Sequence, residues 1–125
     1  MKYRDYIPAR KLLYPIFQSL AVKGLYEIRL KFPISEIKYD KRLFVNELSH
    51  PCVLEMLLNF DREYWDAVMI SEDAYLVDGQ HRLAVAKLMG IKYIDAVIRK
   101  SGAESTFDKR KLRRVRRGQE KYIQT

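Results

Sequence analysis

The stretch from residue 74 to residue 90 constrains the fold of this chain more than any other part of the sequence. It begins with the apolar run 74–77, passes through Asp78-Gly79, and continues with closely spaced apolar residues until Gly90. Glycine lets the backbone turn sharply, and the apolar residues after it are dense enough for a helix that is buried on most sides. The sequence therefore predicts a strand that passes within two residues into a helix over residues 79–89.

Other apolar patterns predict three further strands. Residues 26–32 alternate apolar and charged side chains, which is typical of a half-buried strand. Residues 66–71 predict a strand that pairs with 74–77 in a hairpin. The alternation over 94–98 predicts the last strand.

Two other helices are predicted. Residues 10–23 place their apolar side chains on one helix face; the regular helix would start near Pro15, and Gly24 would end it. Ser49 would cap a helix over residues 50–58, and Trp65 would close the core beside it. The buried stripe of that helix would consist of Val53, Leu54, Leu57 and Leu58. The order of the elements predicts an α+β fold, with a small mixed β-sheet flanked by helices.

Charge divides the chain into three parts. The formal charge is +5 over residues 1–31, −4 over 32–98 and +7 over 99–125. We therefore expect an N-terminal basic helical segment (1–24), a folded domain (25–100) and a basic C-terminal tail (101–125). Basic ends on a mildly acidic body favour a polyanionic partner, although they would also serve to keep the protein in solution.

The composition limits the setting and the metal chemistry. One cysteine, Cys52, excludes an internal disulfide and suits a reducing compartment. No stretch approaches the roughly 18 apolar residues that a membrane span needs, and the first ten residues do not resemble a signal peptide. We therefore expect a cytoplasmic protein without a membrane partner. One cysteine and two histidines also leave no metal–thiolate site.

The turn before the helix at 79–89 carries the candidate binding chemistry. The first amides of a helix have no internal partners and point toward the positive end of the helix dipole, which favours an anion. Gly79 allows close approach to these amides, and Arg82 adds a charged fork that suits phosphate oxygens. Asp78 has a second interpretation as a helix cap, His81 as a histidine at the core edge, and Arg82 as a surface ion-pair partner.

The C-terminal tail contains a dense basic run. Residues 109–117 hold seven basic residues in nine, so charge is expected on nearly all faces of a helix there. This favours a nucleic-acid-binding tail that becomes ordered on contact and binds with little regard to sequence. The alternative is a solvated C-terminal helix. The seven residues are Lys109, Arg110, Lys111, Arg113, Arg114, Arg116 and Arg117.

From Phe32 to Arg99 the sequence resembles the N-terminal domain of ParB partition proteins and the related sulfiredoxins. The matching pieces are Pro33-Ile34-Ser35-Glu36-Ile37 with Arg42 nearby, the helix 50–58, the hairpin 66–77, Asp78-Gly79-Gln80-His81-Arg82-Leu83-Ala84, and the closing Gly90-Ile91 with the strand 94–98. The resemblance implies a ParB/sulfiredoxin-like fold and a pocket for the phosphates of a nucleotide such as ATP, ADP or CTP. The matching pocket positions are Gly79, Gln80, His81 and Arg82.

Departures from the family patterns narrow the activity. Sulfiredoxins have a catalytic cysteine where this chain has Gln80, and partition proteins usually have Gly-Glu-Arg-Arg and continue into a helix-turn-helix domain. Because Gln80 replaces the cysteine, thiol repair is not expected. Because the motif differs and only about 27 residues follow the last strand, a segregation clamp is not expected either. Relatives often supply a second basic residue from the helix matching 50–58, which has none here. Lys41, Arg42 or His50 would have to replace it.

Three functions follow as hypotheses. The first is a nucleotide-phosphate-binding protein that associates with DNA or RNA through its basic ends. The second is a phosphotransferase of the small-molecule kinase type, or a nuclease, that uses the same pocket. In that case Asp78 and Glu36 are the candidate bases or partners of Mg²⁺. The third is a nucleic-acid-binding regulator with a vestigial pocket.

Overall fold

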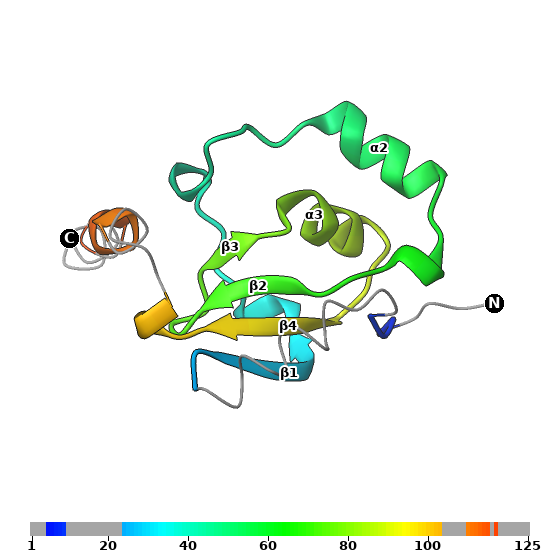
Figure 1. The fold of residues 1–125 in the computed structure, drawn as a ribbon. Coiled ribbons are helices and arrows are strands. Elements are labelled where there is room, and N and C mark those ends of the chain that lie inside the picture. Colours follow the sequence, from blue (N-terminus) through cyan, green and yellow to red (C-terminus); the bar gives the residue numbers. More distant parts are fainter. Residues whose placement is uncertain (1–4, 10–23, 104–109, 116, 118–125) are drawn as a thin grey trace.

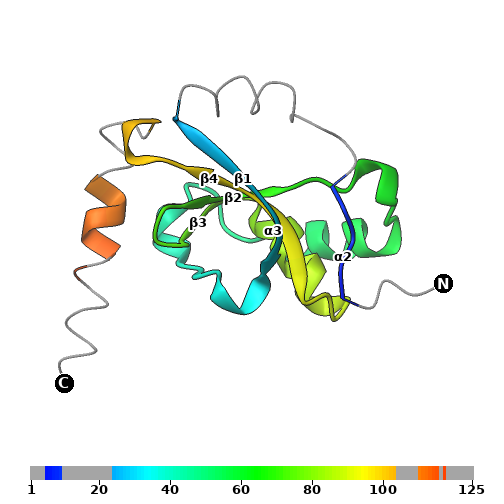
Figure 2. The same ribbon diagram turned by 90° about the horizontal axis from the view of Figure 1, so that it is seen from below.

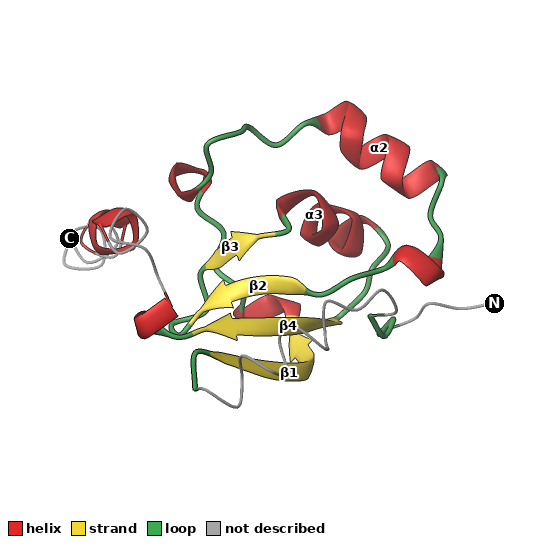
Figure 3. Cartoon of the chain, in the orientation of Figure 1, coloured by secondary structure: helices red, strands yellow, loops and turns green. Residues whose placement is uncertain are grey.

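The computed structural model describes residues 5–9, 24–103, 110–115 and 117. Within these residues it shows one β-sheet with two α-helices on one side (Figures 1 and 3). The predicted helix over 10–23 lies outside the described residues, as do Lys109 and Arg116.

All four predicted strands are present and form a mixed sheet in the order β1-β4-β2-β3. The central strand β4 (Tyr93–Arg99) pairs antiparallel with β1 (Tyr26–Pro33) and parallel with β2 (Val68–Ser71). β3 (Leu76–Asp78) pairs antiparallel with β2, as the predicted hairpin requires. Five consecutive residues of β4, from 94 to 98, are buried, because other parts of the chain cover both faces of the strand.

The two helices form successive layers above the sheet. α3 (Gln80–Leu88) packs against β2, and α2 (His50–Leu58) packs against α3 (Figure 1). Ser49 caps α2 as predicted, since its hydroxyl accepts a hydrogen bond from the Cys52 amide at 3.3 Å. None of the described helices is long and apolar enough to cross a membrane.

The predicted buried stripe of α2 is partly wrong. Val53 is buried and Leu57 is half-buried, but Leu54 is 55% exposed and Leu58 is 82% exposed. α2 is the outermost layer and meets the rest of the protein through one narrow face, so residues one position away from that face contact solvent. Trp65 is buried in the core beside Val53, as predicted.

β1 departs from the strict alternation that its sequence predicts. The pairing with β4 shifts between Arg29 and Phe32, Lys31 has φ of 54°, and Leu30 is 62% exposed. The cause lies in β4, where Asp95 is 2% exposed. A buried carboxylate needs donors, and the bulge turns the Lys31 amide onto it at 3.1 Å.

Asp95 also holds the segment 5–9 on the sheet. Its carboxylate accepts hydrogen bonds from the Tyr6 hydroxyl at 2.7 Å and from the Ala9 amide at 2.8 Å. Burial and the bond to Asp95 raise the pKa of the Tyr6 phenol. The segment therefore lies beside the start of β4, where Tyr6 also forms a bridge to Tyr93.

The described part of the C-terminal basic run is helical over residues 110–115, and residue 117 is helical as well. Leu112 and Val115 are buried against Tyr75, with Leu43 partly buried in the same cluster. The expectation of charge on nearly all faces is therefore wrong, because residues 112 and 115 lie three apart and form an apolar face that packs on the domain. Figure 2 shows this helix at the end of the molecule opposite α2.

Candidate phosphate-binding site

Gly79 joins β3 to α3 in a backbone conformation that only glycine adopts easily. It is the N-cap of α3, with φ of 99° and ψ of 31°. A Cβ atom at this position would lie 2.9 Å from Val68 Cγ1 and 3.3 Å from Arg82 Nη1. The absence of a side chain therefore lets α3 begin directly over β2 and leaves room for the Arg82 guanidinium.

The first turn of α3 has no capping side chain. The N-cap position is occupied by Gly79, which has no side chain. The interpretation of Asp78 as the helix cap is therefore wrong. The Leu83 amide donates to the Gly79 carbonyl at 2.9 Å, and the three amides before it are the ones that a helix leaves without internal acceptors. This end of α3 therefore offers aligned donors and the positive end of the helix dipole to an anion.

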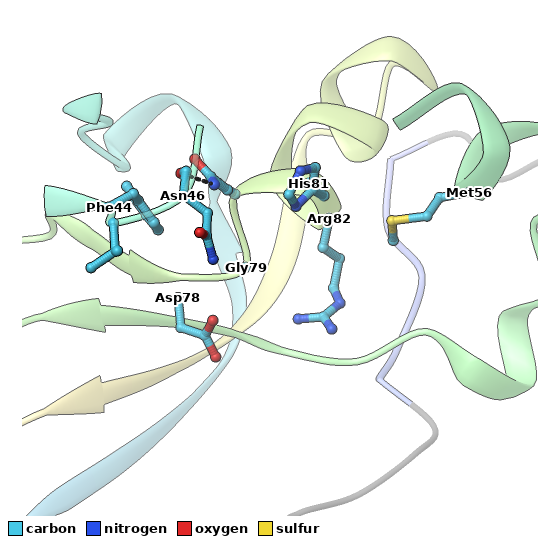
Figure 4. A pocket seen from close by; sticks show the side chains of 9 residues that line it. Phe44, Asn46, Met56, Asp78, Gly79, His81 and Arg82 are labelled. Atoms are coloured by element: carbon cyan, nitrogen blue, oxygen red, sulfur yellow. Dashed lines mark hydrogen bonds between the residues drawn. The ribbon is translucent and has the colours of Figure 1, made fainter. Parts of the chain in front are cut away.

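A cavity of about 390 Å³ opens at this turn (Figure 4). Its volume lies within the range of about 300–1,000 Å³ that is typical of small-molecule sites. The wall opposite α3 comes from the loop after the 3₁₀ turn η2 (Lys41–Leu43) and from α2. The lining consists of Phe44, Val45, Asn46, Met56, Asp78, Gly79, Gln80, His81 and Arg82.

Arg82 is held at the cavity by a hydrogen bond to the segment that leads into β2. Its Nη1 donates to the Ala67 carbonyl at 2.8 Å, and its side chain is half-buried. A guanidinium has five N–H donors, so this bond orients the group and leaves most of the fork for a ligand. Phosphate oxygens match that fork in a bidentate arrangement.

The Gln80 side chain connects α3 to the loop before α2. Its side chain is buried, its Oε1 accepts from the Tyr39 hydroxyl at 2.9 Å, and its Nε2 donates to the Asn46 carbonyl at 2.9 Å. Both ends of the amide are therefore engaged in fixing the loop before α2 against α3. Gln80 also has a backbone amide in the first turn of α3, where a ligand can accept from it.

His81 links the two helices at the cavity. Its Nε2 accepts a hydrogen bond from the Ser49 amide at 3.0 Å, which joins the first turn of α3 to the cap of α2. This contact agrees with the interpretation of His81 as a histidine at the core edge bonded to backbone. The ring also lines the cavity, and the acceptor role of Nε2 places the proton on Nδ1.

Neither Arg42 nor Glu36 is among the described residues that line the cavity. Arg42 pairs with Asp40, with 2.6 Å between Nη2 and Oδ2, and the hydrogen bond from this guanidinium lowers the pKa of the Asp40 carboxyl. Glu36 ends the 3₁₀ turn η1 (Ile34–Glu36) and is exposed. Their assignment to the site stays a prediction.

Sequence reasoning missed the wall formed by Phe44, Val45, Asn46 and Met56. These residues carry no local signal, since the first three lie in a polar loop and Met56 is one of several apolar residues of α2. The loop is held against α3 by contacts between residues far apart in sequence, such as the hydrogen bond from Gln80 to Asn46, 34 residues away.

The charged groups of the lining nearly balance. Arg82 and the first turn of α3 supply positive potential, and Asp78, whose side chain is exposed, supplies the one carboxylate among the described lining residues. The described residues contain no group of three or more His, Cys, Asp or Glu that could hold a metal ion. Mg²⁺ usually keeps several waters and binds one or two carboxylates together with phosphates, so Asp78 fits such an ion only beside a bound phosphate.

The comparisons with solved structures show the fold. A pNOB8-like ParB N-domain superposes with a TM-score of 0.51 at 19% identity, over 60% of this chain and 28% of that one. The C2221 form of a Pnob8-like ParB-N domain gives 0.45 at 20% identity, over 60% and 29%. Sulfiredoxin from Arabidopsis thaliana gives 0.47 at 20% identity, over 60% and 86%.

This chain thus spans less than a third of the two ParB structures. No protein-family model matches it. No curated protein matches it either. The ParB/sulfiredoxin-like α+β fold that the sequence predicts is confirmed.

Proposed function

We propose that this chain is a cytoplasmic protein that binds the phosphates of a nucleotide in the cavity at the start of α3. The observation that carries the proposal is the left-handed Gly79 cap, which leaves the first turn of α3 uncapped directly beside the Arg82 guanidinium. Amide donors, dipole and guanidinium converge on one side of a cavity of ligand size. The exposed thiol of Cys52 suits a reducing compartment.

The rest of the lining suits a nucleoside. Val45 is 83% exposed and Met56 is 36% exposed, although both are apolar. They line the cavity together with Phe44, opposite the polar turn. ATP, ADP or CTP would place its phosphates at residues 79–82 and its base or sugar against this apolar wall.

The test is a calorimetric titration of wild type and Arg82→Ala with ATP, ADP and CTP, each with and without Mg²⁺. Loss of a charge-assisted bidentate contact costs about 2–3 kcal/mol, so Arg82→Ala should bind roughly 30- to 150-fold more weakly. Arg82→Lys should recover only part of the affinity, because an ammonium lacks the fork. Lys87→Ala is the matched control, since it removes one positive charge from the exposed end of the same helix.

Folding must be followed alongside affinity. Arg82→Ala also removes the hydrogen bond to the Ala67 carbonyl, which should cost about 1 kcal/mol of stability. A melting temperature that falls by only a few degrees, together with lost binding, supports the site. Equal nucleotide affinity in wild type and Arg82→Ala would overturn it.

A second candidate function is a Mg²⁺-dependent phosphotransferase or nuclease that uses Asp78. The favouring observation is that Asp78 lines the cavity and is not engaged in capping α3. Asp78→Asn should bind nucleotide more tightly than wild type in EDTA, because a negative charge near the phosphates is gone. It should lose the Mg²⁺-dependent gain in affinity and any turnover. Wild-type turnover in Asp78→Asn would remove Asp78 from the chemistry and leave Glu36 as the untested candidate.

The third hypothesis, a regulator with a vestigial pocket, predicts that nucleotides do not stabilise the folded protein. A ligand at 100 times its dissociation constant stabilises the folded protein by roughly 2.7 kcal/mol. A thermal-shift panel in which no nucleotide raises the melting temperature would favour this hypothesis over the other two.

A further inference from the structure

The C-terminal helix is held to the domain by its apolar side. Leu112 is 1% exposed, Val115 is 2% exposed, and both pack on Tyr75, which is 2% exposed. Tyr75 lies directly before β3, and the Lys38 ammonium sits 5.1 Å above the centre of its ring. These contacts fix how the helix is rotated about its own axis relative to the domain.

Burial of that side turns four arginines outward together. Arg110, Arg113, Arg114 and Arg117 are all exposed, and we call them the arginine face. Their spacing of i, i+3, i+4 and i+7 places them within an arc of about 100° around the helix, opposite residues 112 and 115. The face extends for about 10 Å along the helix axis at a rise of 1.5 Å per residue.

The arginine face works against the stability of its own helix. Like charges three or four residues apart each cost about 0.2–0.5 kcal/mol. Within the described part of the chain, no carboxylate forms an ion pair with any of the four. A bound polyanion would relieve this repulsion, and an array of this kind fits a row of phosphates.

We propose that the arginine face is a preformed site for the phosphodiester backbone of a nucleic-acid duplex. Each guanidinium can bind a phosphate through two parallel N–H bonds, and a major groove about 12 Å wide admits an α-helix. An anionic membrane is a poorer partner, because within residues 110–117 the apolar residues, 112 and 115, are buried in the protein and no other apolar residue lies beside the arginines for insertion. The proposal does not depend on nucleotide binding at α3.

This site differs in a measurable way from a tail that becomes ordered on contact. Seven phosphate contacts, one for each basic residue of 109–117, would give a log–log salt slope of about −6 on duplex DNA. The four arginines of the preformed face contribute about −3.6 of slope. Binding should show little sequence preference, because backbone contacts carry no sequence information.

The experiment measures fluorescence anisotropy of labelled duplex DNA of about 20 bp, with the full chain, across a salt series. The test variant carries Arg110→Gln, Arg113→Gln, Arg114→Gln and Arg117→Gln. The matched control carries Arg29→Gln, Lys41→Gln, Lys87→Gln and Lys92→Gln. These residues are exposed on the domain, and their replacement removes the same number of positive charges. Glutamine is a good helix former, so residues 112 and 115 should keep the helix docked.

The test variant should bind at least about 30-fold more weakly at low salt, with a salt slope less steep by about 3.6, while the control changes affinity by less than about threefold. A fourfold Arg→Lys variant should keep the slope and lose part of the affinity, which separates charge from the guanidinium fork and guards against misfolding of the glutamine variant. Duplex RNA, a single strand and vesicles containing phosphatidylserine form the other arms. Equal losses in test and control variants, an unchanged slope, or equally tight binding to vesicles would overturn the proposal.

Discussion

Replacement of Gly79 by alanine tests the geometry on which the candidate site depends. The new Cβ would lie 2.9 Å from Val68 Cγ1 and 3.2 Å from Val68 Cβ. Val68 is 1% exposed and lies in β2, where it pairs with Ala96 of β4. Rotation of the valine side chain moves Cγ1 but not Cβ, so the clash is relieved only by a shift of the sheet or of α3.

The expected cost has two parts. A left-handed backbone costs a residue with a side chain about 1–2 kcal/mol, and overpacking in a close-packed site adds about 1–3 kcal/mol. Gly90→Ala separates the parts, because Gly90 has φ of 74° and a Cβ there would meet nothing within 4 Å. Both variants also restrict the unfolded chain equally, so that effect cancels in the comparison. Gly79→Ala should therefore lose about 1–3 kcal/mol more than Gly90→Ala.

Urea denaturation followed by fluorescence of Trp65, the one tryptophan of the sequence, measures both free energies of unfolding. Nucleotide titration of the same proteins adds a functional readout. The Cβ would also lie 3.3 Å from Arg82 Nη1, so Gly79→Ala should lose phosphate affinity while Gly90→Ala keeps it. Equal losses of stability in the two variants would refute the steric reasoning, and unchanged affinity in Gly79→Ala would refute the link to Arg82.

Three further predictions concern other parts of the molecule. Gln80→Glu should destabilise the protein by about 1–3 kcal/mol in urea, because an oxygen replaces the donor to the Asn46 carbonyl; wild-type stability would contradict the proposed loop contact. Wild type should lose stability relative to Tyr6→Phe as the pH rises above about 10, since the pKa of Tyr6 is raised in the folded state and the unfolded chain ionises first; a difference that stays constant from about pH 9 to about pH 11 would contradict this. Leu112→Ala should lower the free energy that holds the C-terminal helix on the domain by about 2–3 kcal/mol, and so speed tryptic cleavage within 110–117 by roughly 30- to 150-fold. Leu54→Ala, at a 55% exposed position, should leave that rate unchanged.

The sheet and its helices were predictable because their signals are local. The alternation over 26–32, the apolar runs of the hairpin and the glycine at the start of 79–89 each fix a secondary structure within a few neighbours. The bulge in β1 was not predictable in this way. It arises because Asp95, 64 residues away from Lys31, is buried and draws that amide toward itself. Alternation records which side chains are apolar and carries no information about a distant acceptor.

The packing of the C-terminal helix also depends on a residue that is distant in sequence. Leu112 and Val115 were visible in the sequence as two apolar residues in a basic run, too few to bury a helix alone. Tyr75 supplies the missing apolar surface from the end of the hairpin, more than 30 residues earlier in the chain. A charge pattern that looks uniform in sequence thus becomes one-sided once two residues find a partner.

In the candidate site, too, local features were predictable from the sequence and distant contacts were not. Gly79 and Arg82 were predictable because both act within one turn, through backbone conformation and position in the helix. Gln80 lies in that turn too, yet its side-chain amide is bonded to Tyr39 and Asn46 on the opposite wall. Any phosphate bound here would therefore be contacted by first-turn amides and by Arg82, while residue 80 controls the opposite wall. It follows that substitutions at Gln80 should change affinity for the nucleoside part of a ligand more than affinity for inorganic phosphate, and those at Arg82 should do the reverse.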